Sequence, residues 1–186
     1  MKKLTLIVLF FLSIIATVSK AGNSDQGFIN VPGGPVWYKV SGDGEGLPLL
    51  ALHGGPGSTS CNYSLLEPLG DQRPIIRYDQ LGSGRSGRPD DLSLWEVARF
   101  VEALDIIRQE LKLKQFHLLG HSWGAALAGA YLVEKGTSGV ASVIFSSPLL
   151  STPLWIEDAN YLRSQLPKDI QDILKLHEAA DTTNSD

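Results

Sequence analysis

The sequence predicts an α/β fold, in which a mostly parallel sheet of about six strands has helices on both faces. Short, wholly apolar runs at residues 49–52 and 116–119 are typical of strands that are covered on both sides. An amphipathic pattern between residues 94 and 111 separates strand-like runs, and this alternation favours parallel pairing. The third observation is an abrupt change at residues 120–124 from an apolar strand to a helix rich in alanine and glycine.

The start of the chain is typical of a secretory signal peptide. Two lysines precede an apolar run at residues 4–18, and Ser19 and Ala21 place small side chains at the positions that define cleavage. The run is short for a membrane span, which needs about 20 apolar residues; an uncleaved anchor is the alternative. We expect residues 1–21 to be removed after Ala21, so that the product is exported to a periplasm or secreted, without a membrane partner.

The composition is that of an ordinary globular domain, with 43% hydrophobic and 19% charged residues and a net charge of −4. This mildly acidic balance offers no basic stripe, so we expect no nucleic-acid partner. The one cysteine, Cys61, excludes an internal disulfide and is expected to be a small filler rather than a reactive thiol. Residues 22–150 are expected to form the core, residues 151–180 the start of a helical cap, and residues 181–186 a polar tail.

Turn signals and hydrophobic periodicity predict the individual elements. Two β-rich runs at residues 28–31 and 36–40 flank a Pro/Gly turn and indicate an antiparallel hairpin. The helix at 94–111 carries one apolar stripe, and Ser93 and Glu96 predict a capping box at its start. After the hairpin we expect the order β, loop, β, α, β, α, β, with strands at 49–52, 75–78, 116–119 and 141–145. The helix after the third of these strands is expected to stop at Gly136. Two cap helices are expected, one at 152–166 with Thr152 as its N-cap and one at 167–180.

The corner at residues 120–124 reads Gly120-His121-Ser122-Trp123-Gly124, which is typical of a nucleophile elbow. A serine at such a corner has a strained backbone, which is tolerated when the residues two before and two after it are glycines, as Gly120 and Gly124 are. The hydroxyl is pushed out above the sheet, and the first amides of the next helix point at the same place. Ser122 is therefore the candidate nucleophile. The alternative is a glycine-rich turn without a function.

A second candidate segment follows the strand at 49–52 and reads His53-Gly54-Gly55-Pro56-Gly57. Ligands of open α/β sheets bind beyond the carboxyl ends of the strands, so this loop and Ser122 are expected to converge. Its glycines allow the backbone to approach a substrate carbonyl. An amide of the loop, for which we choose Gly55, would form an oxyanion hole with the amide of Trp123. The alternative is a Gly/Pro turn without a function.

A third segment follows the strand at 75–78 and reads Asp79-Gln80-Leu81-Gly82-Ser83-Gly84-Arg85-Ser86. Its G-x-G stretch could bind phosphate, but no helix pattern opens directly behind it and the Lys-Ser/Thr pair of a P-loop is missing. We interpret the segment as a structural turn in which Asp79 and Arg85 tie the floor of the loop to the rim of the active site.

In their order and spacing, these three segments resemble the proline iminopeptidase (prolyl aminopeptidase) family of serine peptidases, which have the α/β-hydrolase fold. The resemblance implies release of an N-terminal residue, typically proline, from small peptide substrates with a free N-terminus. It implies neither a metal nor an organic cofactor. By this resemblance Ser122 attacks, Gly55 and Trp123 donate to the oxyanion, and His53 holds its loop, which includes Gly54, by hydrogen bonding.

The resemblance also implies residues that the sequence lacks. The triad order in this fold is Ser, then Asp or Glu, then His, and the last two follow strands seven and eight. We expect both beyond Asp186, so that the chain is an N-terminal part of the fold, nearly inactive alone, with an exposed apolar edge at the strand at 141–145. None of the four histidines is expected to act as the base. Two alternatives stay open: another α/β-hydrolase, such as an esterase or amidase, or a non-catalytic scaffold protein.

Overall fold

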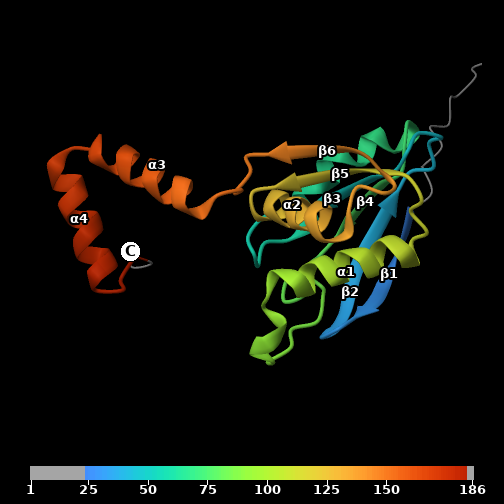
Figure 1. The fold of residues 1–186 in the computed structure, drawn as a ribbon, viewed down its shortest axis with the longest axis horizontal. Helices are drawn as coiled ribbons and strands as arrows, with labels where there is room; N and C mark the ends of the chain where they lie inside the picture. The colour runs from blue at the N-terminus through green and yellow to red at the C-terminus, as the bar shows by residue number, and fades with distance from the viewer. Residues whose placement is uncertain (1–23, 184–186) are drawn as a thin grey trace, which may run out of the picture.

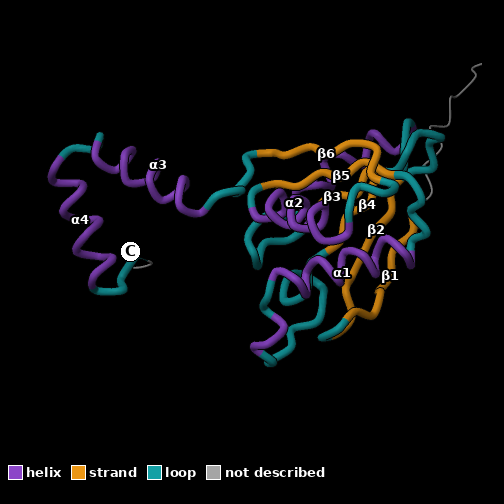
Figure 2. Tube along the Cα trace, viewed as in Figure 1, coloured by secondary structure: helices purple, strands orange, loops and turns teal. Residues whose placement is uncertain are grey.

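The computed structural model describes residues 24–183, so the expected signal peptide lies outside the described residues. The strands form one sheet, and the helices either lie against it or extend away from it (Figures 1 and 2). The helical segments are η1 (Ser60–Asp71), η2 (Leu92–Leu94), α1 (Val97–Glu110), α2 (Trp123–Lys135), α3 (Thr152–Ser164) and α4 (Lys168–Ala179). Over residues 24–183, no helix is both long enough and apolar enough to cross a membrane.

The six strands of the described residues form a mixed sheet with the order β1-β2-β4-β3-β5-β6. They are β1 (Ser24–Val31), β2 (Gly34–Ser41), β3 (Leu49–Leu52), β4 (Ile75–Tyr78), β5 (Phe116–His121) and β6 (Val140–Ser146). β1 pairs antiparallel with β2, and β2 with β4, whereas β4, β3, β5 and β6 pair parallel. The expected α/β fold is confirmed, and the carboxyl ends of the parallel strands meet at one edge of the sheet.

Helical segments cover both faces of this sheet. α1 and α2 lie side by side on one face, where Leu104 and Leu127 join Ile76 of β4 in the buried core (Figure 1). Successive side chains of a strand point to opposite faces, so Arg77, the next residue of β4, points the other way. There its Nε lies 3.0 Å from Glu67 Oε1 of η1. The segment η1 therefore covers the face opposite α1 and α2.

The hairpin strands begin earlier than expected, at Ser24 and Gly34. Two segments between β3 and β5 also differ from expectation. The helix expected from residue 94 begins at Val97, because Asp91 accepts the amide of Ser93 at 2.9 Å and its hydroxyl at 2.8 Å and so caps the short helix η2 instead. The capping box expected from Ser93 and Glu96 is wrong, because the Ser93 hydroxyl already donates to Asp91. The stretch between β3 and β4, expected as a loop, contains the 3-10 helix η1.

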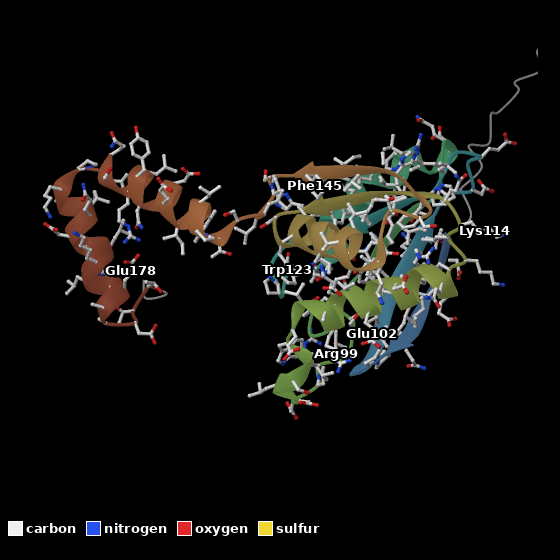
Figure 3. All side chains as sticks on the ribbon, in the orientation of Figure 1. Arg99, Glu102, Lys114, Trp123, Phe145 and Glu178 are labelled. Carbon is white, nitrogen blue, oxygen red and sulfur yellow. The ribbon has the colours of Figure 1, made fainter. Side chains whose placement is uncertain are left out.

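The last two helices, α3 and α4, extend away from the sheet, and neither contains a buried residue (Figure 1). The N-cap of α3 is Ser151, whose Oγ accepts from the Leu154 amide at 3.5 Å, so the cap lies one residue before the expected Thr152. An ion pair joins the two helices, with Arg163 Nη1 3.0 Å from Glu178 Oε2; Figure 3 labels Glu178 on α4. The helices are thus linked to each other by charge.

At the far side of the sheet, β6 is the edge strand, as the sequence predicts. Ile144 and Phe145 are 48% and 41% exposed. Figure 3 shows Phe145 near the point where the chain leaves β6 towards α3. The apolar edge expected at this strand is therefore present in the described part of the chain.

Candidate active site

Ser122 lies at the corner between β5 and α2, where the elbow motif places it. Its φ of 53° and ψ of −118° are a combination that residues other than glycine rarely adopt. The corner is also tightly packed. A methyl group on Gly120 would collide with the Gly124 carbonyl, and one on Gly124 would collide with the Leu52 carbonyl oxygen at the end of β3. Glycine at both positions therefore permits the close approach that forms the turn.

Backbone hydrogen bonds hold Ser122 in this conformation. Its amide donates to the Ser146 carbonyl at the end of β6 at 3.0 Å, and its carbonyl accepts from the Ala125 amide in the first turn of α2 at 3.0 Å. The sheet and the helix thus anchor the strained residue from two sides. Ser122 also lines a cavity of about 510 Å³, so it lies at an open surface and not in the core.

His53 is a buried, neutral residue that organises the loop after β3. It is 2% exposed, and burial lowers the pKa of its imidazole. Its Nε2 accepts from the Gln80 amide at 2.9 Å, so Nδ1 carries the proton and donates to the Gly54 carbonyl at 2.8 Å. By the family resemblance, His53 holds its loop by hydrogen bonding, and its bond to the Gly54 carbonyl fits that expectation.

The bond to His53 orients the peptide that joins Gly54 and Gly55. In a planar trans peptide the carbonyl and the next amide point in opposite directions. Because the Gly54 carbonyl faces the imidazole, the Gly55 amide points away from it. Gly55 has a φ of 121°, which favours glycine. A methyl group on Gly54 would lie 3.2 Å from the Ser122 Cβ, so the loop and the elbow are in contact, as expected.

Gln80, two residues after β4, links the loop after β3 to the elbow helix. Its Nε2 donates to the His53 carbonyl at 2.8 Å, and its Oε1 accepts from the Trp123 indole Nε1 at 2.9 Å. The indole also packs edge-on against Phe100, with 5.6 Å between ring centroids. Gln80 was not among the residues predicted from the sequence. The available signal was a polar residue two positions after a buried strand.

Asp79 ties together two loops under the site. Its Oδ1 accepts from the Ser60 amide at 2.8 Å and hydroxyl at 2.7 Å, and its Oδ2 accepts from the Arg85 amide at 3.0 Å. Burial raises the pKa of Asp79, but these hydrogen bonds outweigh it and hold the pKa below its usual value. Arg85 takes part through its backbone. Its guanidinium instead lies 4.2 Å from the Trp37 ring centroid.

The cavity beside Ser122 extends towards η1. Apolar side chains of η1 and β5, including Leu66 and Leu119, line it together with Gly55 and Tyr63. The Tyr63 hydroxyl donates to the Leu52 carbonyl at 2.8 Å, and burial raises its pKa to about 12, so it stays protonated. Tyr63 therefore holds the carboxyl end of β3 from the other face. It was not predicted from the sequence, because η1 was expected as a loop.

Residues 48–183 match the family model described as the alpha/beta hydrolase fold. This match covers most of the chain and every segment of the candidate site. The chain belongs to the α/β-hydrolase fold family. Within this family, the elbow and the loop after β3 are where a nucleophile and oxyanion donors are expected.

Similar proteins narrow the comparison within the α/β-hydrolases. A proline iminopeptidase of Heyndrickxia coagulans is 50% identical over 162 residues, which cover 87% of this chain and 56% of that protein. The crystal structures of VinJ and of proline iminopeptidase from Mycobacterium smegmatis are each 31% identical, with TM-scores of 0.80 and 0.76 and the same two coverages, 87% and 56%. The resemblance to proline iminopeptidases is thus confirmed, and the chain spans about half the length of these relatives.

The described histidines of this α/β-hydrolase are engaged away from the Ser122 hydroxyl. His121 Nδ1 lies 3.3 Å from Ser146 Oγ, and His117 Nδ1 lies 2.7 Å from Ser142 Oγ. Between residues 24 and 183, no histidine is hydrogen-bonded to Ser122, and no group of three His, Cys, Asp or Glu side chains could hold a metal ion. The structure thus brings Ser122, the loop after β3 and the first turn of α2 together.

Proposed function

We propose that the chain supplies the nucleophile and the oxyanion hole of a serine hydrolase of the proline iminopeptidase type. The observation that carries the proposal is the strained Ser122, held at the β5–α2 corner against the Gly54-Gly55 loop. This geometry suits acyl transfer, because a reactive hydroxyl and amide donors then face the same substrate carbonyl. The substrates would be short peptides with a free N-terminus, and the released residue typically proline.

In the proposed reaction, the Ser122 hydroxyl gives its proton to a general base, and its Oγ bonds to the carbonyl carbon of the N-terminal residue. The carbonyl oxygen becomes negatively charged and accepts hydrogen bonds from the Gly55 and Trp123 amides. The tetrahedral intermediate then expels the rest of the peptide as an amine, which takes up the proton that the base received. Water hydrolyses the acyl-enzyme and releases the amino acid. His53, neutral and bound to backbone groups, shapes the loop and takes no proton.

The rate depends on a general base, and no histidine of residues 24–183 is hydrogen-bonded to Ser122. Loss of the histidine of a serine-protease triad lowers kcat by about 10⁶, or roughly 8 kcal/mol of barrier. The oxyanion hole and binding alone retain about 10³ to 10⁴ over water. We therefore expect this chain to react slowly with strong electrophiles and to turn over peptides hardly at all.

A fluorophosphonate probe tests the nucleophile directly, with imidazole added as an external base. We expect a single adduct, detected by mass spectrometry, that disappears in Ser122→Ala and persists in Ser64→Ala. Ser64 is an exposed residue of η1 and serves as the matched control. An adduct that survives Ser122→Ala would refute the proposed nucleophile, and complete absence of labelling would favour a non-catalytic scaffold.

The substrate class is tested with the p-nitrophenyl esters of L-proline and of N-acetyl-L-proline, again with imidazole, because an activated ester reacts where this chain would hardly turn over an amide. The proposal expects Ser122-dependent release of p-nitrophenolate that is faster from the ester with the free N-terminus. Equal Ser122-dependent rates for the two esters would support an esterase and refute the peptidase assignment. We also propose export of the product, supported by the basic and apolar start of the sequence. A mature N-terminus at Gly22, read by mass spectrometry, is the expected result.

A further inference from the structure

We propose that Gln80 is a positioning residue that sets the two halves of the oxyanion hole relative to each other. This inference rests on the proposed function of the Gly55 and Trp123 amides. Gln80 is 2% exposed and makes three hydrogen bonds: its amide to His53 Nε2 at 2.9 Å, its Nε2 to the His53 carbonyl at 2.8 Å, and its Oε1 from the Trp123 indole at 2.9 Å.

The position of Gln80 beyond the carboxyl end of β4 makes this link direct. In the strand order β4-β3-β5, β3 lies between the strand that precedes Gln80 and the strand that leads to the elbow. The Gln80 side chain therefore crosses the carboxyl end of β3 to reach Trp123, the first residue of α2. On the way it holds the His53 carbonyl, at the start of the loop that carries Gly55. One side chain thus contacts both segments that present the proposed donors.

Only a carboxamide satisfies both neighbours at this site. The His53 carbonyl requires a donor, and the Trp123 indole requires an acceptor. Glutamate would offer acceptors alone and would place a carboxylate oxygen against the His53 carbonyl. Leucine would leave both groups without a partner in a buried place, which favours a shift of the loop or of the indole. Donors of an oxyanion hole act only within a narrow range of positions, so such a shift lowers the rate.

The test uses a nucleophile that needs no histidine. In a Ser122→Cys, Cys61→Ser background, the introduced thiol lies at the N-terminus of α2, which favours the thiolate. With p-nitrophenyl acetate, a C–S bond forms, the ester C–O bond breaks, p-nitrophenolate leaves and an oxyanion develops on the way. With iodoacetamide, the thiolate displaces iodide and no oxyanion forms. The ratio of the two rates therefore reports the oxyanion hole separately from access and thiol reactivity.

Gln80→Leu in this background should lower the rate of acylation about 10-fold or more, while alkylation stays within about 2-fold. Gln80→Glu keeps the acceptor for Trp123, so its acylation rate should lie between those of Gln80→Leu and the unchanged background. Trp123→Phe removes the indole N–H donor together with part of the ring that packs against Phe100, and should lower the acylation rate by a few-fold. Trp123→Phe and Gln80→Glu together decide the question if Gln80→Leu does not fold. Equal losses in both reactions, or an unchanged acylation rate, would overturn the proposal.

These outcomes are independent of the peptidase assignment. If the proline ester is not preferred over its N-acetyl form but the acylation-to-alkylation ratio still depends on Gln80, the substrate proposal fails and the positioning role stands. If the proline ester is preferred in a Ser122-dependent reaction but the ratio is the same with and without Gln80, the positioning role fails and the function stands.

Discussion

Replacement of Asp79 by asparagine probes the polar framework beneath the site. The carboxylate accepts three hydrogen bonds, two from Ser60 and one from the Arg85 amide. Asparagine keeps an acceptor for Ser60 but turns its NH₂ group towards the Arg85 amide, so two donors face each other. A hydrogen bond to a charged group contributes about 1.5–3 kcal/mol. We expect Asp79→Asn to lower the free energy of unfolding by about 2–3 kcal/mol, and Asp79→Ala, which loses all three bonds, by about 4 kcal/mol or more.

Urea unfolding followed by tryptophan fluorescence measures this change, with Asp90→Asn as the matched control at an exposed aspartate. Because the pKa of Asp79 is lowered in the folded state, its contribution is present above the unfolded pKa of about 3.9 and is lost as the pH falls through the lower folded value. The difference between wild type and Asp79→Asn should therefore shrink in acid. Equal stability of the two proteins at neutral pH, or an equal loss in Asp90→Asn, would refute the reasoning.

Three further predictions concern the elbow and the loop. Gly124→Ala places a methyl group against the Leu52 carbonyl and should destabilise the chain by about 3 kcal/mol or more, whereas Gly129→Ala in the same helix has room and should be neutral or slightly stabilising; thermal unfolding compares them. His53→Ala frees the Gly54 carbonyl and should slow fluorophosphonate labelling about 10-fold or more. Because burial lowers the folded pKa of His53, wild type should also lose stability as the pH falls below about 6.5, and the variant should lose less. Tyr63→Phe removes one hydrogen bond to a backbone carbonyl and should cost about 1 kcal/mol in urea unfolding, with labelling still dependent on Ser122; no loss would contradict the role given to Tyr63.

The features that the sequence predicted have local causes. The parallel strands follow from apolar runs, and the elbow follows from the glycines two residues either side of Ser122. Gly120 makes room for the Gly124 carbonyl within the same turn, whereas Gly124 makes room for Leu52 of the neighbouring strand. The loop at 53–57 could be placed next to Ser122, because the carboxyl ends of adjacent parallel strands meet at one edge. Family resemblance then supplied the function that such an elbow performs.

The features that were missed depend on contacts between distant segments. Gln80 bonds to residues 27 and 43 positions away, and no pattern in its own segment indicates either partner. The 3-10 helix η1 contains Pro68 and Gly70, which disfavour a helix by propensity, and it forms over the face of β3 and β4. The Ser93 hydroxyl donates to the neighbouring Asp91, and the spacing rule for a capping box takes no account of such a neighbour.

The strained backbone of Ser122 lowers the stability of the chain at the residue that carries the reactive hydroxyl. A non-glycine residue in such a conformation costs about 1–3 kcal/mol, which glycine at the same position would recover. A library selected for heat resistance alone would therefore be expected to enrich Ser122→Gly and discard the reactive hydroxyl. A substitution that stabilises the chain at residue 122 removes the nucleophile, so stabilising substitutions belong on surfaces remote from the elbow.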